Sequence, residues 1–281
     1  MIKQLHNLQR EYLHGDKLRA AADFFVTEAE PVPKDLGARS GVIFCHTHFL
    51  DDLFRALAGS KQRYLLISHN SDYGVTRPLV ERKPSCIKAW YAQNVIDGCG
   101  FVTPLPIGME RPGIASSGDI TIIHKQWMQK RERWNLVYMS MNPNTNVDAR
   151  WTAIHALEGR SYVTYRPLEQ RVPFPSFIEE MYHHPFVISP PGNGLDCIRT
   201  WEALYLGVIP IVLDSYMAAE FADLPMLFVS NYADLDEQQL EQTYLQMMSR
   251  EWNLSKMTTS YWLKRIRLHW QEIEHANTAE L

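Results

Sequence analysis

An arginine and a glutamate that follow a glycine- and proline-rich turn are the residues best placed to do chemistry. The turn spans 190–194, Arg199 follows it, and Glu202 comes three residues later. A helix entered from such a turn offers unpaired amides and the positive end of its dipole to an anion. At a spacing of three, both side chains lie on one side of that helix, so Arg199 suits a phosphate and Glu202 suits ribose hydroxyls. The alternative is an ordinary Arg–Glu pair on the surface. The turn's contribution to the predicted nucleotide site comes from Pro191, Gly192, Asn193 and Gly194, and Asp196 is expected to cap the helix.

The elements around this turn are those of an α/β protein. Residues 186–188 form a short apolar run typical of a buried strand, and residues 209–213 form another. Between them, apolar residues recur at helical spacing until Gly207 ends the helix.

A second strand–turn–helix unit precedes the first. A strand over 134–140 leads into a polar turn over 142–146, and Arg150 lies in the helix that follows. This turn can also offer amides to an anion, although its side chains are equally suited to capping the helix. The donor-side candidates here are Asn142, Thr145, Asn146 and Arg150, together with Tyr165 on the next strand, 162–165.

Two polar clusters follow predicted strands in the N-terminal half. The first cluster, after the strand 42–45, consists of His46, His48, Asp51 and Asp52. The second, after the strand 64–67, consists of His69, Asn70 and Asp72. Ligands bind beyond the carboxyl ends of parallel strands, so both clusters are site candidates. Imidazole and carboxylate can bind a metal or act as a general base. We rank the candidate bases in the order Asp72, His69, Asp51.

Strands alternate with helices along the chain, which predicts a largely parallel sheet in each of two domains. The stretch 109–132 is expected to be a linker, which gives domains over 1–118 and 119–281. Helices are expected over 3–25, 236–250 and 255–274. The last of these is rich in tryptophan and basic residues, which favours packing back on the N-terminal domain and leaves peripheral membrane contact as an alternative.

Composition excludes several classes of protein. The chain has 281 residues, of which 46% are hydrophobic and 21% charged, as in a globular protein. A net charge of −4 argues against nucleic acid as a partner. The sequence lacks an apolar run long enough to span a membrane and a signal-peptide core, and its four cysteines lack zinc-ligand spacing. We therefore expect free thiols and a cytoplasmic location.

The segment Ser189-Pro-Pro-Gly-Asn-Gly-Leu-Asp196, with the following Arg199-Thr-Trp-Glu-Ala203 and Gly207-Val-Ile-Pro-Ile211, resembles the donor-binding segment of exostosin-like glycosyltransferases. The small viral and bacterial members look closest. Trp90-Tyr-Ala-Gln-Asn94, Pro104-Leu-Pro-Ile-Gly108 and the Asn142–Asn146 turn followed by Arg150 fit the same group. The resemblance covers roughly residues 64–213.

This resemblance implies a GT-B type of fold, in which two Rossmann-like domains face each other across a cleft. The C-terminal domain would hold a nucleotide-sugar, and the N-terminal domain would hold a glycan acceptor such as an oligosaccharide, glycoprotein or glycolipid. It further implies transfer of a hexose or pentose from a nucleoside-diphosphate sugar, UDP-linked before GDP-linked, with inversion and without a metal or other cofactor. Two alternatives stay open: a non-catalytic nucleotide-sugar-binding module, and a metal-dependent hydrolase that uses His46, His48 and Asp51.

Overall fold

The computed structural model describes residues 5, 8, 11–112, 118–215 and 217–278, which form two compact units. The N-terminal unit comprises 13–107 and 256–281, and the C-terminal unit comprises 1–12 and 108–255. The chain therefore passes between the units after Tyr12, Ile107 and Ser255. No helix in the described ranges is long and apolar enough to cross a membrane.

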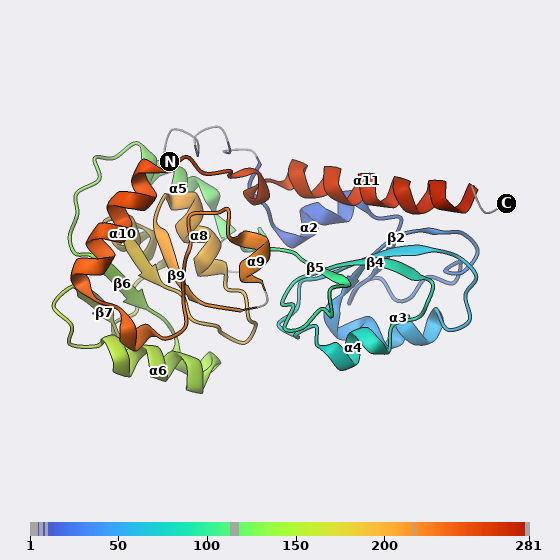
Figure 1. The fold of residues 1–281 in the computed structure, drawn as a ribbon, viewed down its shortest axis with the longest axis horizontal. Coiled ribbons are helices and arrows are strands. Elements are labelled where there is room, and N and C mark those ends of the chain that lie inside the picture. The colour runs from blue at the N-terminus through green and yellow to red at the C-terminus, as the bar shows by residue number, and fades with distance from the viewer. Residues whose placement is uncertain (1–4, 6–7, 9–10, 113–117, 216, 279–281) are drawn as a thin grey trace. The chain divides into compact units, whose positions relative to one another are not determined.

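The N-terminal unit is built on a five-stranded parallel sheet whose strands follow one another in chain order. Helices α3 and α4 cover one face, and α2 and α11 lie on the other (Figure 1). The central strands β2 and β3 are buried at every position, which explains their continuous apolar runs. The elements are β1 (Phe24–Val26), β2 (Gly41–His46), β3 (Tyr64–His69), β4 (Ile87–Ala92), β5 (Val102–Pro104), α2 (Gly15–Leu18), α3 (Leu50–Ala56), α4 (Arg77–Glu81) and α11 (Thr259–Thr278).

The expected helix over 3–25 is only partly present in its described part, where α2 and the 3₁₀ turn Arg19–Ala21 are its helical pieces. Its last residues form the edge strand β1, which pairs in parallel with β2. The helix was predicted from leucines at helical spacing earlier in the stretch. The three-residue strand gives no such pattern, because it depends on pairing with the edge of β2. Residues 3–4, 6–7 and 9–10 of this stretch lie outside the described residues.

The C-terminal unit has a second five-stranded parallel sheet, in the order β10-β9-β8-β6-β7. Its first strand, β6, lies between β7 and β8, so the chain reverses direction across the sheet after β7. A buried apolar cluster joins α6 and α10 to the strands, while α5, α7 and α8 contact one another. The elements are β6 (Val137–Ser140), β7 (Val163–Arg166), β8 (Phe186–Ile188), β9 (Ile209–Leu213), β10 (Leu227–Val229), α5 (Ile120–Trp127), α6 (Val147–Leu157), α7 (Phe174–Tyr182), α8 (Ile198–Leu206), α9 (Ala218–Phe221) and α10 (Glu237–Ser249).

The prediction of two parallel-sheet, Rossmann-like α/β units is confirmed. The stretch 109–132, expected to be a linker, contains helix α5. Asp119 caps this helix by accepting a hydrogen bond from the Thr121 amide, and Ile123 and Trp127 are buried. Residues 113–117 of the same stretch lie outside the described part of the chain.

Candidate functional site

The reversal of strand order places a candidate site at the carboxyl ends of β6 and β8. In an open parallel sheet, loops diverge at such a switch point and leave room for a ligand. The loop after β6 spans 141–146 and the loop after β8 spans 189–197. These are the two turns that the sequence singles out, and the sheet makes them neighbours.

Arg150 joins these two loops through their backbones. It is buried, its Nε donates to the Pro191 carbonyl at 3.1 Å, and its Nη1 donates to the Asn142 carbonyl at 2.8 Å. Its Nη2 lies 3.8 Å from Sγ of Cys197. A cation held by two carbonyls on opposite loops fixes the distance between them, so Arg150 positions both turns.

The polar side chains of the first turn hold its shape. The Asn142 side chain accepts from the Asn144 amide, and the Thr145 hydroxyl donates to the Asn142 carbonyl. Asn146 caps α6 through the Ala149 amide, and its Nδ2 donates to the Gly192 carbonyl at 3.1 Å. The cap role that the sequence left open for Asn146 is therefore present in the structure, together with a second link between the loops.

The second turn differs from expectation at the start of α8. The helix begins after Cys197, which makes no side-chain cap. Asp196, expected to cap it, instead accepts from Nε1 of Trp201 at 2.8 Å and 3.0 Å. The expected cap is wrong because the indole, one turn further on, captures the carboxylate. The first amides of α8 are thus not closed by an Asp196 cap.

Arg199 carries the strongest sign of a missing ligand. Its Nε and Nη1 are buried and have no hydrogen-bond partner within the described chain. Burial lowers the pKa of its guanidinium. Buried polar groups nearly always have partners, and a charged one without any is costly. An anion bound at the start of α8 would satisfy both nitrogens.

Glu202 is buried on the same helix and lies within the electrostatic influence of Arg199. Only 4% of it is exposed, and burial raises the pKa of its carboxyl to about 8, opposed by Arg199 and reinforced by Glu110. The carboxyl group is therefore protonated at neutral pH and can both donate to and accept from a hydroxyl group.

Tyr232 lies within the electrostatic influence of Arg199, which the sequence did not indicate. Its hydroxyl is buried, and burial raises its pKa, with Cys197, Arg199 and the Leu213 backbone among the neighbouring groups that act on it. It lies in the 3₁₀ turn Tyr232–Asp234, far along the chain from Arg199. No spacing pattern links the two, so only the fold reveals it.

The remaining predicted donor residues differ in their burial. Asn193 is exposed at the tip of the second turn, whereas Gly194 is buried. Tyr165, on the edge strand β7, packs partly buried against the apolar core of the unit.

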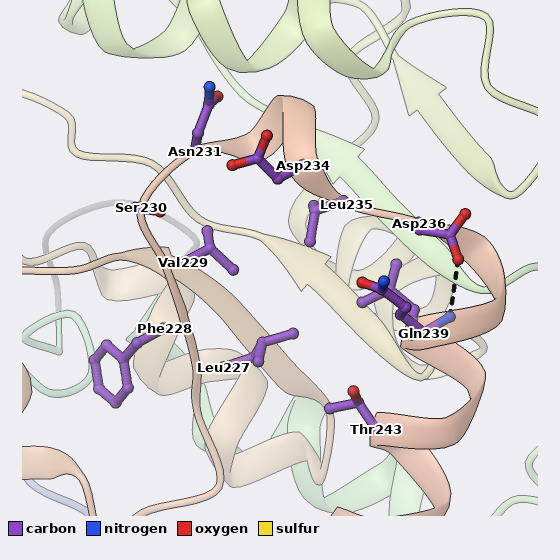
Figure 2. A pocket seen from close by; sticks show the side chains of 11 residues that line it. Leu227, Phe228, Val229, Ser230, Asn231, Asp234, Leu235, Asp236, Gln239 and Thr243 are labelled. Carbon is purple, nitrogen blue, oxygen red and sulfur yellow. Dashed lines mark hydrogen bonds between the residues drawn. The ribbon is translucent and has the colours of Figure 1, made fainter.

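A separate groove lies along β10 and the start of α10 (Figure 2). Two of its polar side chains are engaged in local caps, since Asn231 accepts from the Ala233 amide and Asp236 from the Gln239 amide. None of the residues that line it belongs to the two switch-point loops.

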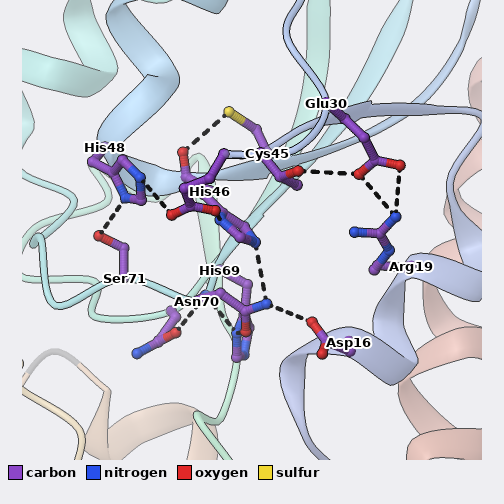
Figure 3. Close-up of polar contacts among 12 residues, drawn as sticks. Asp16, Arg19, Glu30, Cys45, His46, His48, His69, Asn70 and Ser71 are labelled. Atoms are coloured by element: carbon purple, nitrogen blue, oxygen red, sulfur yellow. Dashed lines mark hydrogen bonds and ion pairs between the residues drawn. The ribbon is translucent and has the colours of Figure 1, made fainter. Parts of the chain in front are cut away.

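In the N-terminal unit, the carboxyl ends of β2 and β3 bring the two predicted polar clusters together. His46 pairs in register with His69 (Figure 3). Nε2 of His69 lies 3.0 Å from the Pro106 carbonyl, and its Nδ1 lies 2.8 Å from the Asn70 amide nitrogen. Both ring nitrogens of His69 are therefore engaged with the backbone.

The two carboxylate candidates differ in their surroundings. Asp72 is exposed in the loop after β3. Asp51 is also exposed and forms an ion pair with Arg82 at 3.0 Å. The carboxylate that contacts His46 and His48 is instead Glu28, which the sequence did not indicate.

Comparisons with known proteins find similarity to solved structures but none to family models or curated proteins. No family model matches the sequence, and no curated protein matches it. Among solved structures, an alpha,alpha-trehalose-phosphate synthase (UDP-forming) from Burkholderia vietnamiensis is 10% identical, with a TM-score of 0.45 over 84% of this chain and 73% of that one. An alpha,alpha-trehalose 6-phosphate synthase from Burkholderia multivorans is 11% identical, with a TM-score of 0.47 over 85% of this chain and 72% of that one. The fold assignment rests on the strand order of the two sheets.

We expect Gly192→Ala to lower the free energy of unfolding by about 1–3 kcal/mol, the cost of unsatisfied buried polar groups. A Cβ at Gly192 would lie 2.5 Å from Nη2 of Arg150 and displace the guanidinium from its carbonyls. Urea unfolding measures the loss. In an Arg150→Met background the same glycine substitution should cost much less, and additive effects would contradict this mechanism.

We expect Glu202→Gln to alter the pH dependence of stability. The folded carboxyl titrates near 8 and the unfolded one near 4.5, so the stability gained from its protonated form is present below pH 4.5 and is lost as the pH rises through 8. Relative to Glu202→Gln, the wild type should lose about 3–5 kcal/mol between pH 4.5 and 9, at 1.36 kcal/mol per pKa unit. Urea unfolding at several pH values tests this, and parallel profiles would contradict it.

Proposed function

We propose that this chain is a GT-B-type glycosyltransferase of the exostosin-like kind. It moves a hexose or pentose from a nucleoside-diphosphate sugar to a hydroxyl of a glycan acceptor. The observation that carries the proposal is the pair of buried Arg199 nitrogens, Nε and Nη1, that have no partner within the described chain, together with the buried Glu202 on the same helix after β8. Such a site needs an anion and an adjacent hydroxyl-bearing group, and a nucleoside diphosphate supplies both.

In this mechanism the C-terminal unit holds the donor. Nε and Nη1 of Arg199, with amides of the second turn, stabilise the charge that develops on the departing diphosphate. Glu202 binds the ribose hydroxyls. Arg150 holds the two loops at the spacing that the diphosphate requires. It also contacts a phosphate group directly.

The N-terminal unit supplies the base in the same proposal. The acceptor oxygen attacks the anomeric carbon, the bond from that carbon to the diphosphate breaks, and a carboxylate takes the hydroxyl proton. Asp72, exposed in the loop after β3, is our first choice, followed by His69 at the end of β3 and then by Asp51, which pairs with Arg82. A direct displacement of this kind inverts the anomeric centre and uses no metal.

A thermal-shift screen against nucleotide-sugars tests the proposal. At a hundredfold excess over its Kd, a ligand of the native state adds about 2.7 kcal/mol of stability. UDP-linked sugars are tested first and GDP-linked sugars second. Stabilisation by pyrophosphate but by no nucleotide would contradict the proposal, and donor binding without transfer or hydrolysis would indicate a non-catalytic binding module.

A further inference from the structure

Three side chains of the N-terminal unit bring metal-ligating atoms together, and none of them is a proposed donor residue. Nδ1 of His46 lies 2.6 Å from Oε2 of Glu28, and Nε2 of His48 lies 3.0 Å from Oε1 of the same carboxylate. One ligand atom from each residue falls within 4.8 Å of the others. The His46 and His48 rings lie near one another, with 5.8 Å between their centroids (Figure 3). We propose that Glu28, His46 and His48 bind a divalent transition metal ion.

The sheet holds these three residues in place. His46 is the last residue of β2 and is 4% exposed. His48 lies in the 3₁₀ turn Thr47–Phe49 that follows directly, and Glu28 comes two residues after the end of β1, the neighbour of β2. The parallel pairing of β1 with β2 therefore brings a carboxylate to two histidines from a different loop. A largely preformed site of this kind spares the ion much of the cost of ordering its ligands.

The chemistry of the donor set selects the class of metal. Two imidazoles and one carboxylate suit zinc and its first-row neighbours, whereas magnesium and calcium prefer oxygen ligands alone. Three protein ligands leave a fourth position for water. The Glu28 side chain is 63% exposed, so solvent reaches the cluster.

The outer contacts show what must change when the ion binds. A ligating nitrogen carries no proton, so each ring keeps its proton on the far nitrogen. For His48 that nitrogen is Nδ1, 3.3 Å from the Ser71 hydroxyl, which can accept. For His46 it is Nε2, 3.3 Å from Nδ2 of Asn70. Metal binding therefore turns the Asn70 carboxamide to present its oxygen, which releases the 2.8 Å bond from Nδ2 to Asp16.

Zinc titration of the full chain after chelator treatment tests the site. Calorimetry and native mass spectrometry should show one Zn²⁺ per wild-type chain. Glu28→Gln and His48→Ala change half-exposed or exposed side chains, so both variants should fold, and each should weaken Zn²⁺ binding by more than about 100-fold. Ser71→Ala should weaken it about 10-fold, at the lower end of the usual effect of an outer-shell partner. X-ray absorption should show nitrogen and oxygen ligands near 2.0–2.2 Å.

Asp51→Asn is the matched control. Asp51 is paired with Arg82, so this variant should bind Zn²⁺ as the wild type does. The proposal is overturned if the wild type takes up no zinc, if Glu28→Gln binds zinc unchanged, or if Asp51→Asn loses it. Because Arg199 plays no part in this site, Arg199→Met should keep full zinc binding whatever happens to its binding of nucleotides.

Discussion

Arg199→Met should stabilise the ligand-free protein by about 1–3 kcal/mol, the usual cost of a buried polar group left without a partner. It removes two buried, unpartnered nitrogens and replaces them with an adaptable apolar side chain. The same substitution should lower the affinity for nucleoside diphosphates by more than about 100-fold, because each hydrogen bond to a charged group contributes about 1.5–3 kcal/mol. A gain in stability with a loss of binding marks a residue kept for its ligand.

Urea unfolding of the ligand-free protein measures the first effect, and the thermal shift with a nucleotide-sugar measures the second. Arg160→Met is the matched control, since Arg160 is an exposed arginine of the same unit. This control should change neither quantity. If Arg199→Met instead destabilised the protein and left the thermal shift intact, Arg199 would be a structural residue and the donor site would lie elsewhere.

Asp72→Asn should lower the rate of sugar transfer by about 10²–10⁴-fold, the usual contribution of a general base. The substitution keeps the size of the side chain and removes its ability to take a proton. Donor binding should stay unchanged, because Asp72 lies in the N-terminal unit and the proposed donor residues lie in the other. Product formation with a fixed donor and an acceptor panel gives the rate.

Asp35→Asn serves as its control, because Asp35 is an exposed carboxylate of the same unit that lies in the middle of the β1–β2 connection and not at the end of a strand. Its rate should match the wild type. An Asp72→Asn variant with full activity would remove Asp72 from the mechanism. The same experiment on His69→Gln and Asp51→Asn would then show which remaining candidate takes the proton.

The parts of this fold that depend on local pattern could be predicted from the sequence. Buried parallel strands such as β3 and β8 are continuous apolar runs, and the glycine-rich turn between β8 and α8 breaks both regular structures. The positions of Arg199 and Glu202 on one helix follow from that turn. Their burial could not be predicted, because the surface-pair alternative has the same spacing.

The parts that depend on distant pairing could not be predicted. β1 is too short to show a period and forms only against β2. Glu28 reaches His46 through that pairing. The sequence pointed instead to Asp51, because Asp51 is nearer to His46 along the chain, but Asp51 pairs with Arg82. Tyr232 comes under the influence of Arg199 only through the fold of the C-terminal unit. The switch point itself is a property of strand order, which no local signal encodes.

Calorimetric titration of the wild type and of Arg199→Met with UDP, and then with GDP, tests the central claim most directly. The account predicts saturable binding of one nucleotide to the wild type, with the binding lost in Arg199→Met while Arg160→Met binds as the wild type does. Absence of binding by the wild type, or equal binding by Arg199→Met, would contradict it.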